Sequence, residues 1–277
     1  MGGKNKYVST GLFWFVTAII LFVVVFPILW IYVTAFKGNA DIFTLDLSKM
    51  FWYAPTLNNF DHLFNNTPFY KEISNTAITS VASTALCMII SLPAAYSFAR
   101  WNPGSGHLLF VTISTRMFPA VVAAIPFFFM FKSINLLDTQ IALILLYTYF
   151  NMSFAVFLLY GFFRDIPVEL EHAAQVDGYG RGEIFMRVVL PLILPGAAIT
   201  AVFCLVFAWN EFLYAFLFTR LNARTLSIGI SAFWGSIEIQ WGPMAAGVGL
   251  GILPTLIASF FMQKYIIRGL TFGAVKG

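Results

Sequence analysis

The chain has 277 residues, of which 60% are apolar and 18% are aromatic, while only 10% are charged. A soluble domain is about 45–50% apolar and about 25% charged, so this composition excludes a disordered chain, a secreted disulfide scaffold and a nucleic-acid-binding module. The formal net charge of +4 comes from scattered Lys and Arg residues rather than from a basic run. Such scattered charges fit the loops of a membrane protein, which we expect here.

A membrane-spanning helix needs roughly 20 mostly apolar residues. Six stretches meet this condition, and they predict an all-α, polytopic protein with one membrane domain over residues 1–277. The first stretch is longer than the core of a signal peptide and lacks a cleavage site, so we expect it to stay in the membrane. In chain order the expected spans are 12–36, 73–98, 108–131, 141–163, 197–218 and 243–267.

The Lys and Arg residues of the loops indicate the orientation of these spans. With the N-terminus inside, most of them lie on the cytoplasmic side, including Arg100, Arg164 and Arg181. Both termini are then cytoplasmic, and 164–196 is the longest cytoplasmic connection.

The connection 164–196 has the composition of a folded element rather than of a linker. Pro167 suits the first turn of a helix, and acidic residues follow where the helix dipole favours them. Gly178 can end this helix in a left-handed conformation. A second helix is expected over about 182–189, and Pro191 should end it. The sequence therefore predicts two short helices joined at a Gly turn and lying along the membrane.

The spacing within this connection resembles the Glu-Ala-Ala loop in permease subunits of bacterial ATP-binding-cassette (ABC) importers. That motif reads Glu-Ala-Ala, three residues, Gly, nine residues, Ile, one residue and Leu-Pro. Here the matching residues are His172, Ala173, Ala174, Gly178, Val188, Leu190 and Pro191. His172 stands where the motif has Glu, and Glu171 directly precedes it. Three shorter segments, 116–119, 208–211 and 269–277, also look like carbohydrate permeases of the maltose-permease type.

The resemblance implies a type I ABC importer permease with six transmembrane helices in the bacterial inner (cytoplasmic) membrane. Its cargo would be a sugar or a sugar derivative. Its partners would be a second permease of different sequence, two ATP-binding subunits, a periplasmic or lipid-anchored substrate-binding protein and membrane lipid. No Walker loop is present in the sequence, so this chain would be no enzyme and hold no cofactor, with ATP and Mg bound by the partner subunits.

The resemblance also assigns a contact with the ATPase subunits to specific residues. In the loop these are Glu171, His172, Ala173, Ala174, Asp177, Gly178, Leu190 and Pro191. Which of Glu171 and His172 makes the ionic contact stays open, and an interfacial connector is the alternative. The tail resembles permease tails that reach between the ATPases, with a frayed terminus as the alternative. Its residues are Gly273, Ala274, Val275, Lys276 and Gly277.

Several side chains inside the spans are candidates for the solute pathway: Arg116, Asn151, Trp209, Asn210 and Glu211. An intramembrane Arg costs about 2.5–3.5 kcal/mol, so Arg116 should face a cavity or bond to carbonyl groups freed by Pro119. Glu211 either lines the pathway with its neighbours or clamps two helices. Asn151 is a weaker candidate, because single Asn residues often bond to neighbouring helices.

The loop 220–241 corresponds to the one that meets the binding protein in maltose-type permeases, and a self-packed loop is the alternative. An ion-gradient-driven secondary transporter is the main rival function, with Glu211 as the acid suited to ion coupling. A membrane enzyme lacks support, because the sequence shows no nucleophile or metal cluster. Cys87 and Cys204 lie in apolar stretches and are expected to be small core residues.

Overall fold

The structure, a computed structural model, describes residues 3–50, 52–235 and 239–274. These residues form helices and short connections, and the only β-pairing within them is an isolated bridge between Trp234 and Ile239. The all-α class expected from the sequence is confirmed. The chain forms two compact units, Met1–Tyr70 with Gly229–Leu253, and Lys71–Ile228 with Pro254–Gly277.

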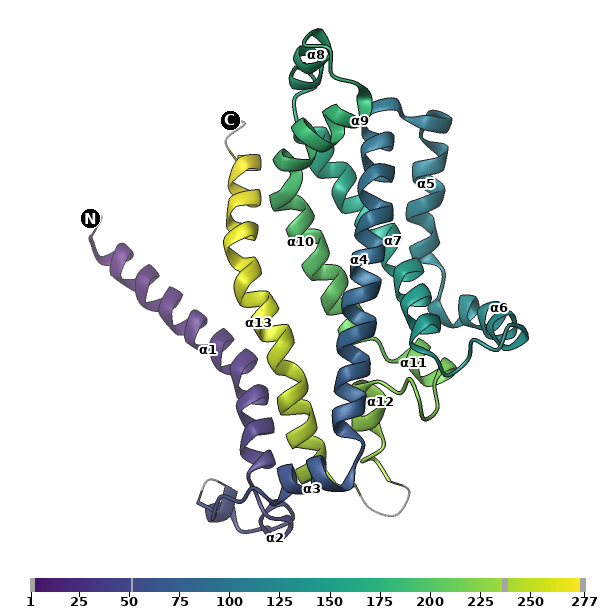
Figure 1. The fold of residues 1–277 in the computed structure, drawn as a ribbon. Coiled ribbons are helices and arrows are strands. Elements are labelled where there is room, and N and C mark those ends of the chain that lie inside the picture. The colour runs from purple at the N-terminus through teal and green to yellow at the C-terminus, as the bar shows by residue number, and fades with distance from the viewer. Residues whose placement is uncertain (1–2, 51, 236–238, 275–277) are drawn as a thin grey trace. The chain divides into compact units, whose positions relative to one another are not determined.

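The first unit combines the N-terminal helices with the beginning of the last helix (Figure 1). It contains α1 (Gly3–Ala35), α2 (Asn39–Ile42), the 3₁₀ turn η1 (Leu47–Met50), α3 (Asn58–Asn66) and the first part of α13 (Trp241–Ala274). An 18-residue window within Thr10–Ala35 has a mean hydropathy of 2.9, and none of its residues is buried within the chain. This helix therefore presents its apolar side chains to surroundings outside the chain.

Two side chains hold this unit together. The Tyr32 hydroxyl donates to the Gly249 carbonyl oxygen of α13 at 2.9 Å, and a β-carbon at Gly249 would lie 3.1 Å from the Tyr32 ring. The buried Asn59 amide donates to the carbonyl oxygens of Ala35 and Lys37 at 2.8 and 2.7 Å. Gly249 therefore allows α1 and α13 to approach closely.

The second unit contains the helices from α4 to the beginning of α12, and the part of α13 that starts at Pro254. They are α4 (Phe69–Trp101), η2 (Pro103–Gly106), α5 (His107–Ser114), η3 (Thr115–Met117), α6 (Ala120–Ser133), α7 (Gln140–Asp165), α8 (Glu169–Val176), α9 (Arg181–Glu183), the π-helix η4 (Ile184–Val189), α10 (Leu190–Trp209), α11 (Leu213–Phe218) and α12 (Leu226–Ser231). Its main core cluster includes Ala95 of α4, Leu159 of α7 and Ile193 of α10. Cys87 and Cys204 are free thiols buried with Ala155, as expected for small core residues.

Five helical stretches are long and apolar enough to cross a membrane, and a bent pair could form a sixth span. The five are Thr10–Ala35, Phe69–Trp101, Gln140–Asp165, Arg181–Trp209 and Trp241–Phe260. They overlap the first, second, fourth, fifth and sixth expected spans. The third expected span and the ends of the fifth expected span differ from the structure.

The third expected span, 108–131, is not one straight helix. The helical segments Pro103–Met117 and Ala120–Ser133 meet at a bend of 94°. Phe118 and Pro119 at the bend have extended ψ values of 133° and 128°. A proline supplies no backbone N–H and disfavours helical geometry in the residue before it, which explains the break.

The fifth span is shifted toward the N-terminus relative to the expected 197–218. The long helical stretch runs over Arg181–Trp209, and a separate short helix, α11, follows it. The expectation that Pro191 ends a helix is wrong. The π-helical turn η4 ends at Val189, two residues before this proline. A π-turn widens the helix, and this leaves room for a ring that would otherwise clash with the carbonyl group four residues earlier.

Candidate functional site

The helix α8 and the turn after it form a folded projection at the end of α7 (Figure 1). Ala174 of α8 and Ile184 of η4 are 7% and 1% exposed, and both belong to the core cluster of the second unit. The loop between α7 and α10 is therefore packed onto the ends of the helices. A rigidly packed loop can transmit a displacement to the helices, as a flexible linker cannot.

Gly178 ends α8 in the way that the sequence predicts. Its φ is 89°, which lies in the left-handed region. The Gly178 N–H donates to the Gln175 carbonyl oxygen at 3.0 Å, and the Tyr179 N–H donates to the Ala174 carbonyl oxygen at 3.1 Å. These two bonds form a Schellman motif, which satisfies carbonyl groups at the helix end.

Glu171 points into the protein and is held by two residues of α4. Its carboxylate accepts hydrogen bonds from the Tyr96 hydroxyl at 2.6 Å and from Arg100 Nε at 2.5 Å. The side chains of Arg100 and Glu171 are only 7% and 6% exposed. Arg100 Nη2 also donates to the Ile166 carbonyl oxygen at 3.0 Å. The charge of Glu171 is therefore neutralised within this chain.

Among the described residues, no side-chain hydrogen bond or ion pair holds the opposite face of α8. His172, Ala173 and Asp177 are exposed, and Val176 is 88% exposed. Of the two residues considered for an ionic contact with a partner, His172 is the one on the open face. Ala174 is buried, so of the Ala-Ala pair only Ala173 offers its methyl group to a partner.

Leu190 and Pro191, the last residues of the motif, lie in the first turn of α10. Pro191 is exposed and Leu190 is partly buried. The second expected helix, 182–189, is therefore the N-terminal part of a continuous helical stretch over Arg181–Trp209. The projection is joined to the fifth span without an intervening loop.

The predicted tail contact lies largely outside the described residues. Val275, Lys276 and Gly277 are not described, and Gly273 and Ala274 are described only as the end of helix α13.

Arg116 lies at the break between α5 and α6. Its Nη1 donates to the Phe150 carbonyl oxygen of α7 at 2.9 Å. Its guanidinium lies over three aromatic rings, with centroids at 4.5 Å for Phe150, 5.4 Å for Phe154 and 5.0 Å for Phe207. These contacts fix α7 and α10 against the broken helix, and they offset the cost of placing a cation there.

Glu211 caps the short helix α11. Its carboxylate oxygens accept hydrogen bonds from the Tyr214 N–H at 2.9 and 3.1 Å and from the Ala215 N–H at 3.2 Å. A carboxylate at a helix N-terminus is stabilised by the free N–H groups there. The adjacent Asn210 is exposed and donates to the Val206 carbonyl oxygen at 2.8 Å, whereas Trp209 is partly buried. Of these three residues, Asn210 is the most open to a solute.

Asn151 is 1% exposed, and its amide donates to the Cys204 carbonyl oxygen of α10 at 3.2 Å. This bond joins α7 to α10.

The sequence analysis missed Tyr96 and Arg100 as residues of the site. A signal was present, because the two lie four residues apart at the end of a span and therefore share a helix face. The sequence could not show that this face contacts Glu171, because Glu171 is 71 residues from Arg100 in the chain.

Comparison with known proteins identifies the family. A family model described as "Binding-protein-dependent transport system inner membrane component" matches residues 88–272. The chain belongs to this family. Members are permease subunits of ABC transporters, so the chain is a transport subunit and not an enzyme.

Two curated relatives match this permease over nearly its whole length. The sulfoquinovosyl glycerol transport system permease protein SmoH of Agrobacterium fabrum is 35% identical, over 99% of this chain and 97% of its own length. The trehalose transport system permease protein SugB of Mycobacterium tuberculosis is 33% identical, over 91% of this chain and 92% of its own.

A solved structure supports the fold of the permease. A chain from a bacterial ABC transporter involved in import of the acidic polysaccharide alginate superposes with a TM-score of 0.82. It is 19% identical and covers 96% of this chain and 99% of its own length. The expected ABC importer permease fold is therefore confirmed.

Proposed function

We propose that this permease forms one half of the translocation channel of an ATP-driven importer for a sugar or a sugar derivative. The main observation in support of this proposal is the folded projection formed by α8 and its Schellman turn. Its inner face is fixed to α4 through Glu171, and its outer face, with His172 and Ala173, is exposed. Such an arrangement suits a surface that a cytoplasmic ATPase subunit grips and moves.

The sugar-type cargo is supported by the names of similar proteins. SmoH is named for sulfoquinovosyl glycerol, SugB for trehalose, and a further relative, DasC of Streptomyces coelicolor, for diacetylchitobiose. DasC is 32% identical over 95% of this chain.

The proposal includes partners and a location. A second, different permease completes the channel, two ATPase subunits bind ATP and Mg, and a periplasmic or lipid-anchored protein delivers the solute. The chain lies in the bacterial inner membrane with both termini in the cytoplasm. One structure of an alginate ABC transporter includes a pentasaccharide-bound periplasmic protein, which supports this kind of assembly.

In this mechanism the ATPase subunits move the projection when they bind and hydrolyse ATP. They can shift the permease between inward-open and outward-open states only if their contacts with the projection differ between the two states. His172, Ala173, Asp177 and Gly178 are the residues of this chain that provide those contacts. Glu171 holds the helix that carries them.

The test is copurification followed by transport. An affinity-tagged version of this chain should bring an ATPase with it, and a hydrolysis-deficient ATPase should abolish uptake in membrane vesicles. Uptake that continues with the inactive ATPase and collapses with an ionophore would instead establish an ion-driven transporter.

A further inference from the structure

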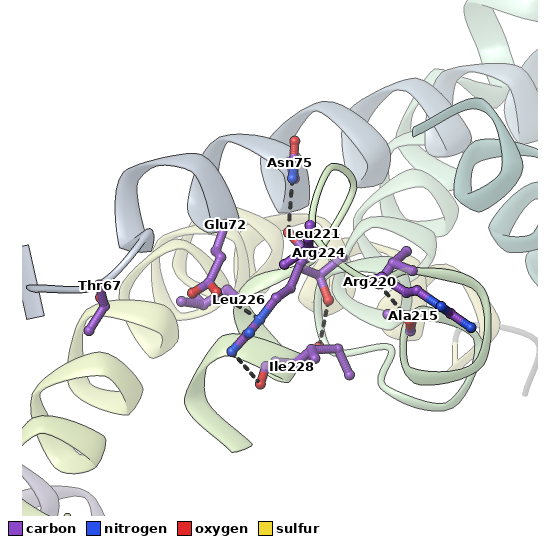
Figure 2. Close-up of polar contacts among 12 residues, drawn as sticks. Thr67, Glu72, Asn75, Ala215, Arg220, Leu221, Arg224, Leu226 and Ile228 are labelled. Atoms are coloured by element: carbon purple, nitrogen blue, oxygen red, sulfur yellow. Dashed lines mark hydrogen bonds and ion pairs between the residues drawn. The ribbon is translucent and has the colours of Figure 1, made fainter. Parts of the chain in front are cut away.

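Three side chains on one face of α4 bind a segment that is distant in the chain. Residues 72, 75 and 76 are spaced three and four apart, so they share a helix face, and all three are buried. They contact residues 219–228, which follow α11 and which we call the 219–228 segment. Figure 2 shows Glu72 and Asn75 pointing from the helix toward this segment.

The contacts involve a charge pair and backbone groups. Arg224 Nε lies 2.9 Å from a carboxylate oxygen of Glu72, whose side chain is 5% exposed. The Asn75 amide donates to two carbonyl oxygens of the segment, those of Asn222 and Arg224, each at 2.9 Å. The Thr76 hydroxyl accepts from the Leu226 N–H at 2.8 Å.

A second attachment comes from the connection between α6 and α7. The Asp138 carboxylate accepts hydrogen bonds from four consecutive N–H groups, those of residues 220, 221, 222 and 223, at 2.9 to 3.3 Å. Gln140 donates to Asn75 Oδ1 at 2.7 Å and so connects the two attachments. The 219–228 segment is therefore attached both to α4 and to the connection between α6 and α7.

The same helix carries the Tyr96–Arg100–Glu171 contacts at its other end. From Glu72 to Arg100 the helix is continuous, and 28 steps of 1.5 Å separate these residues by about 42 Å. One helix thus holds the projection proposed to bind the ATPase and, a membrane thickness away, the 219–228 segment. An ion pair is present at each end: Arg100–Glu171 is buried, whereas in Glu72–Arg224 the carboxylate is buried and the arginine side chain is 24% exposed. Removing one partner leaves a buried charge unpaired, which is costly.

We propose that α4 couples the 219–228 segment to the α8 projection, with Glu72 and Glu171 as the positioning residues at its two ends. A displacement imposed on α8 by the ATPase moves the 219–228 segment, and a ligand that contacts this segment biases the ATPase through the same helix. Because coupling between binding sites is reciprocal, it can be measured in either direction. This inference rests on the proposed function, since it requires an ATPase to move α8.

The experiment measures the coupling from the cytoplasmic side, so no transported solute is needed. Leu221 is 76% exposed, and both native cysteines are buried, so a Leu221→Cys variant gives this chain a single reactive thiol. In the copurified complex with its ATPase subunits, maleimide labelling of this thiol is followed by mass spectrometry. The rate is compared without nucleotide and after trapping with ATP, Mg and vanadate.

The labelling rate should change on trapping in the otherwise unaltered chain. The change should also occur in Lys71→Gln, the matched control, because Lys71 is exposed and adjacent to Glu72. It should be lost in Glu171→Gln, while the rate without nucleotide stays unchanged, because Glu171 of α8 contacts α4 only at the end far from Leu221. It should also be lost in Glu72→Gln with basal ATP hydrolysis retained, and regained when Glu72→Arg is combined with Arg224→Glu.

The outcomes separate this inference from the proposed function. A trapping response that persists in Glu171→Gln, or that is absent from the unaltered chain, overturns the coupling through α4 and leaves the ABC permease intact. A complex that contains no ATPase overturns the proposed function, and the inference with it.

Discussion

Gly178 shows how one residue sets the shape of the α8 projection. A residue with a β-carbon pays about 1–2 kcal/mol in the left-handed conformation that this position has. No atom lies within 4 Å of the β-carbon that would be added, so the strain is purely that of the backbone. Gly178→Leu should therefore leave membrane insertion unchanged but lower uptake and loosen its coupling to ATP hydrolysis.

The matched control is Gly182→Leu. Gly182 belongs to the same loop, also has open space around its β-carbon position, and lacks the positive φ. Uptake and ATP hydrolysis are measured together in proteoliposomes. Equal activity in both variants would show that the left-handed turn has no role in coupling.

Glu171 and His172 are neighbours in the chain with opposite surroundings, so their replacements should act differently. Glu171→Ala leaves the buried Arg100 without a counter-charge and should destabilise the chain by about 3 kcal/mol. His172→Ala removes an exposed side chain and should weaken ATPase association without altering stability. The measurements are the thermal unfolding of the isolated subunit and an ATPase pull-down.

Glu169→Ala is the control, because Glu169 is exposed in the same helix turn. If His172→Ala lowers stability as much as Glu171→Ala, the assignment of the two faces of α8 is wrong.

At the scale of whole elements, the connection between α6 and α7 shapes the 219–228 segment. Burial alone would raise the pKa of the Asp138 carboxyl. The hydrogen bonds that it accepts from four backbone N–H groups together lower that pKa below its ordinary value. Asp138→Asn should therefore speed hydrogen exchange at residues 220–223. The carboxylate is partly exposed, so the expected loss of stability is only about 1 kcal/mol.

The sign of the pH dependence follows from the lowered pKa. The stabilisation by Asp138 is complete above the ordinary Asp pKa of about 3.9 and is lost as the pH falls through the lower folded value. Exchange in the unaltered chain and in Asp138→Asn should differ at pH 7 and converge on acidification. An exposed acid elsewhere, Asp61, provides the control variant Asp61→Asn.

At the scale of the whole molecule, hydropathy predicts the spans better than it predicts their breaks. Long apolar runs identify the helices because lipid requires internal backbone hydrogen bonding, whatever the side chains are. The same runs conceal the 94° bend before α6, where apolar residues continue from Met117. The end of α10 at Trp209 is marked only by Asn210 and Glu211, after which apolar residues resume. Prolines gave opposite results: Pro119 accompanies a break, whereas the π-turn accommodates Pro191.

The candidate site was predictable in spacing and in local geometry but not in the direction of its side chains. The left-handed Gly178 follows from local sequence, because few other residues adopt that conformation. The burial of Glu171 depends on Tyr96 and Arg100, which are distant in sequence, so no local pattern could reveal it. The contacts of Glu72 and Asp138 with the 219–228 segment are hidden for the same reason.

The orientation of the molecule is testable at two exposed positions. Val176, at the end of α8, is 88% exposed and Leu221 is 76% exposed, and the apolar stretch Arg181–Trp209 lies between them in the chain. If that stretch crosses the membrane once, the two positions lie on opposite sides. Arg164, Arg181 and Arg187 flank α8, so its side should be the cytoplasmic one.

Single-cysteine variants Val176→Cys and Leu221→Cys are treated with a membrane-impermeant maleimide, and the buried native thiols should stay unlabelled. Leu221→Cys should react in intact cells whose outer membrane has been made permeable to the reagent. Val176→Cys should react only after the inner membrane is also opened. Labelling of both from outside would mean that Arg181–Trp209 does not cross the membrane. The inverse pattern would place α8 in the periplasm, where no cytoplasmic ATPase could reach it, so the proposed coupling would be impossible whatever the local geometry of the loop.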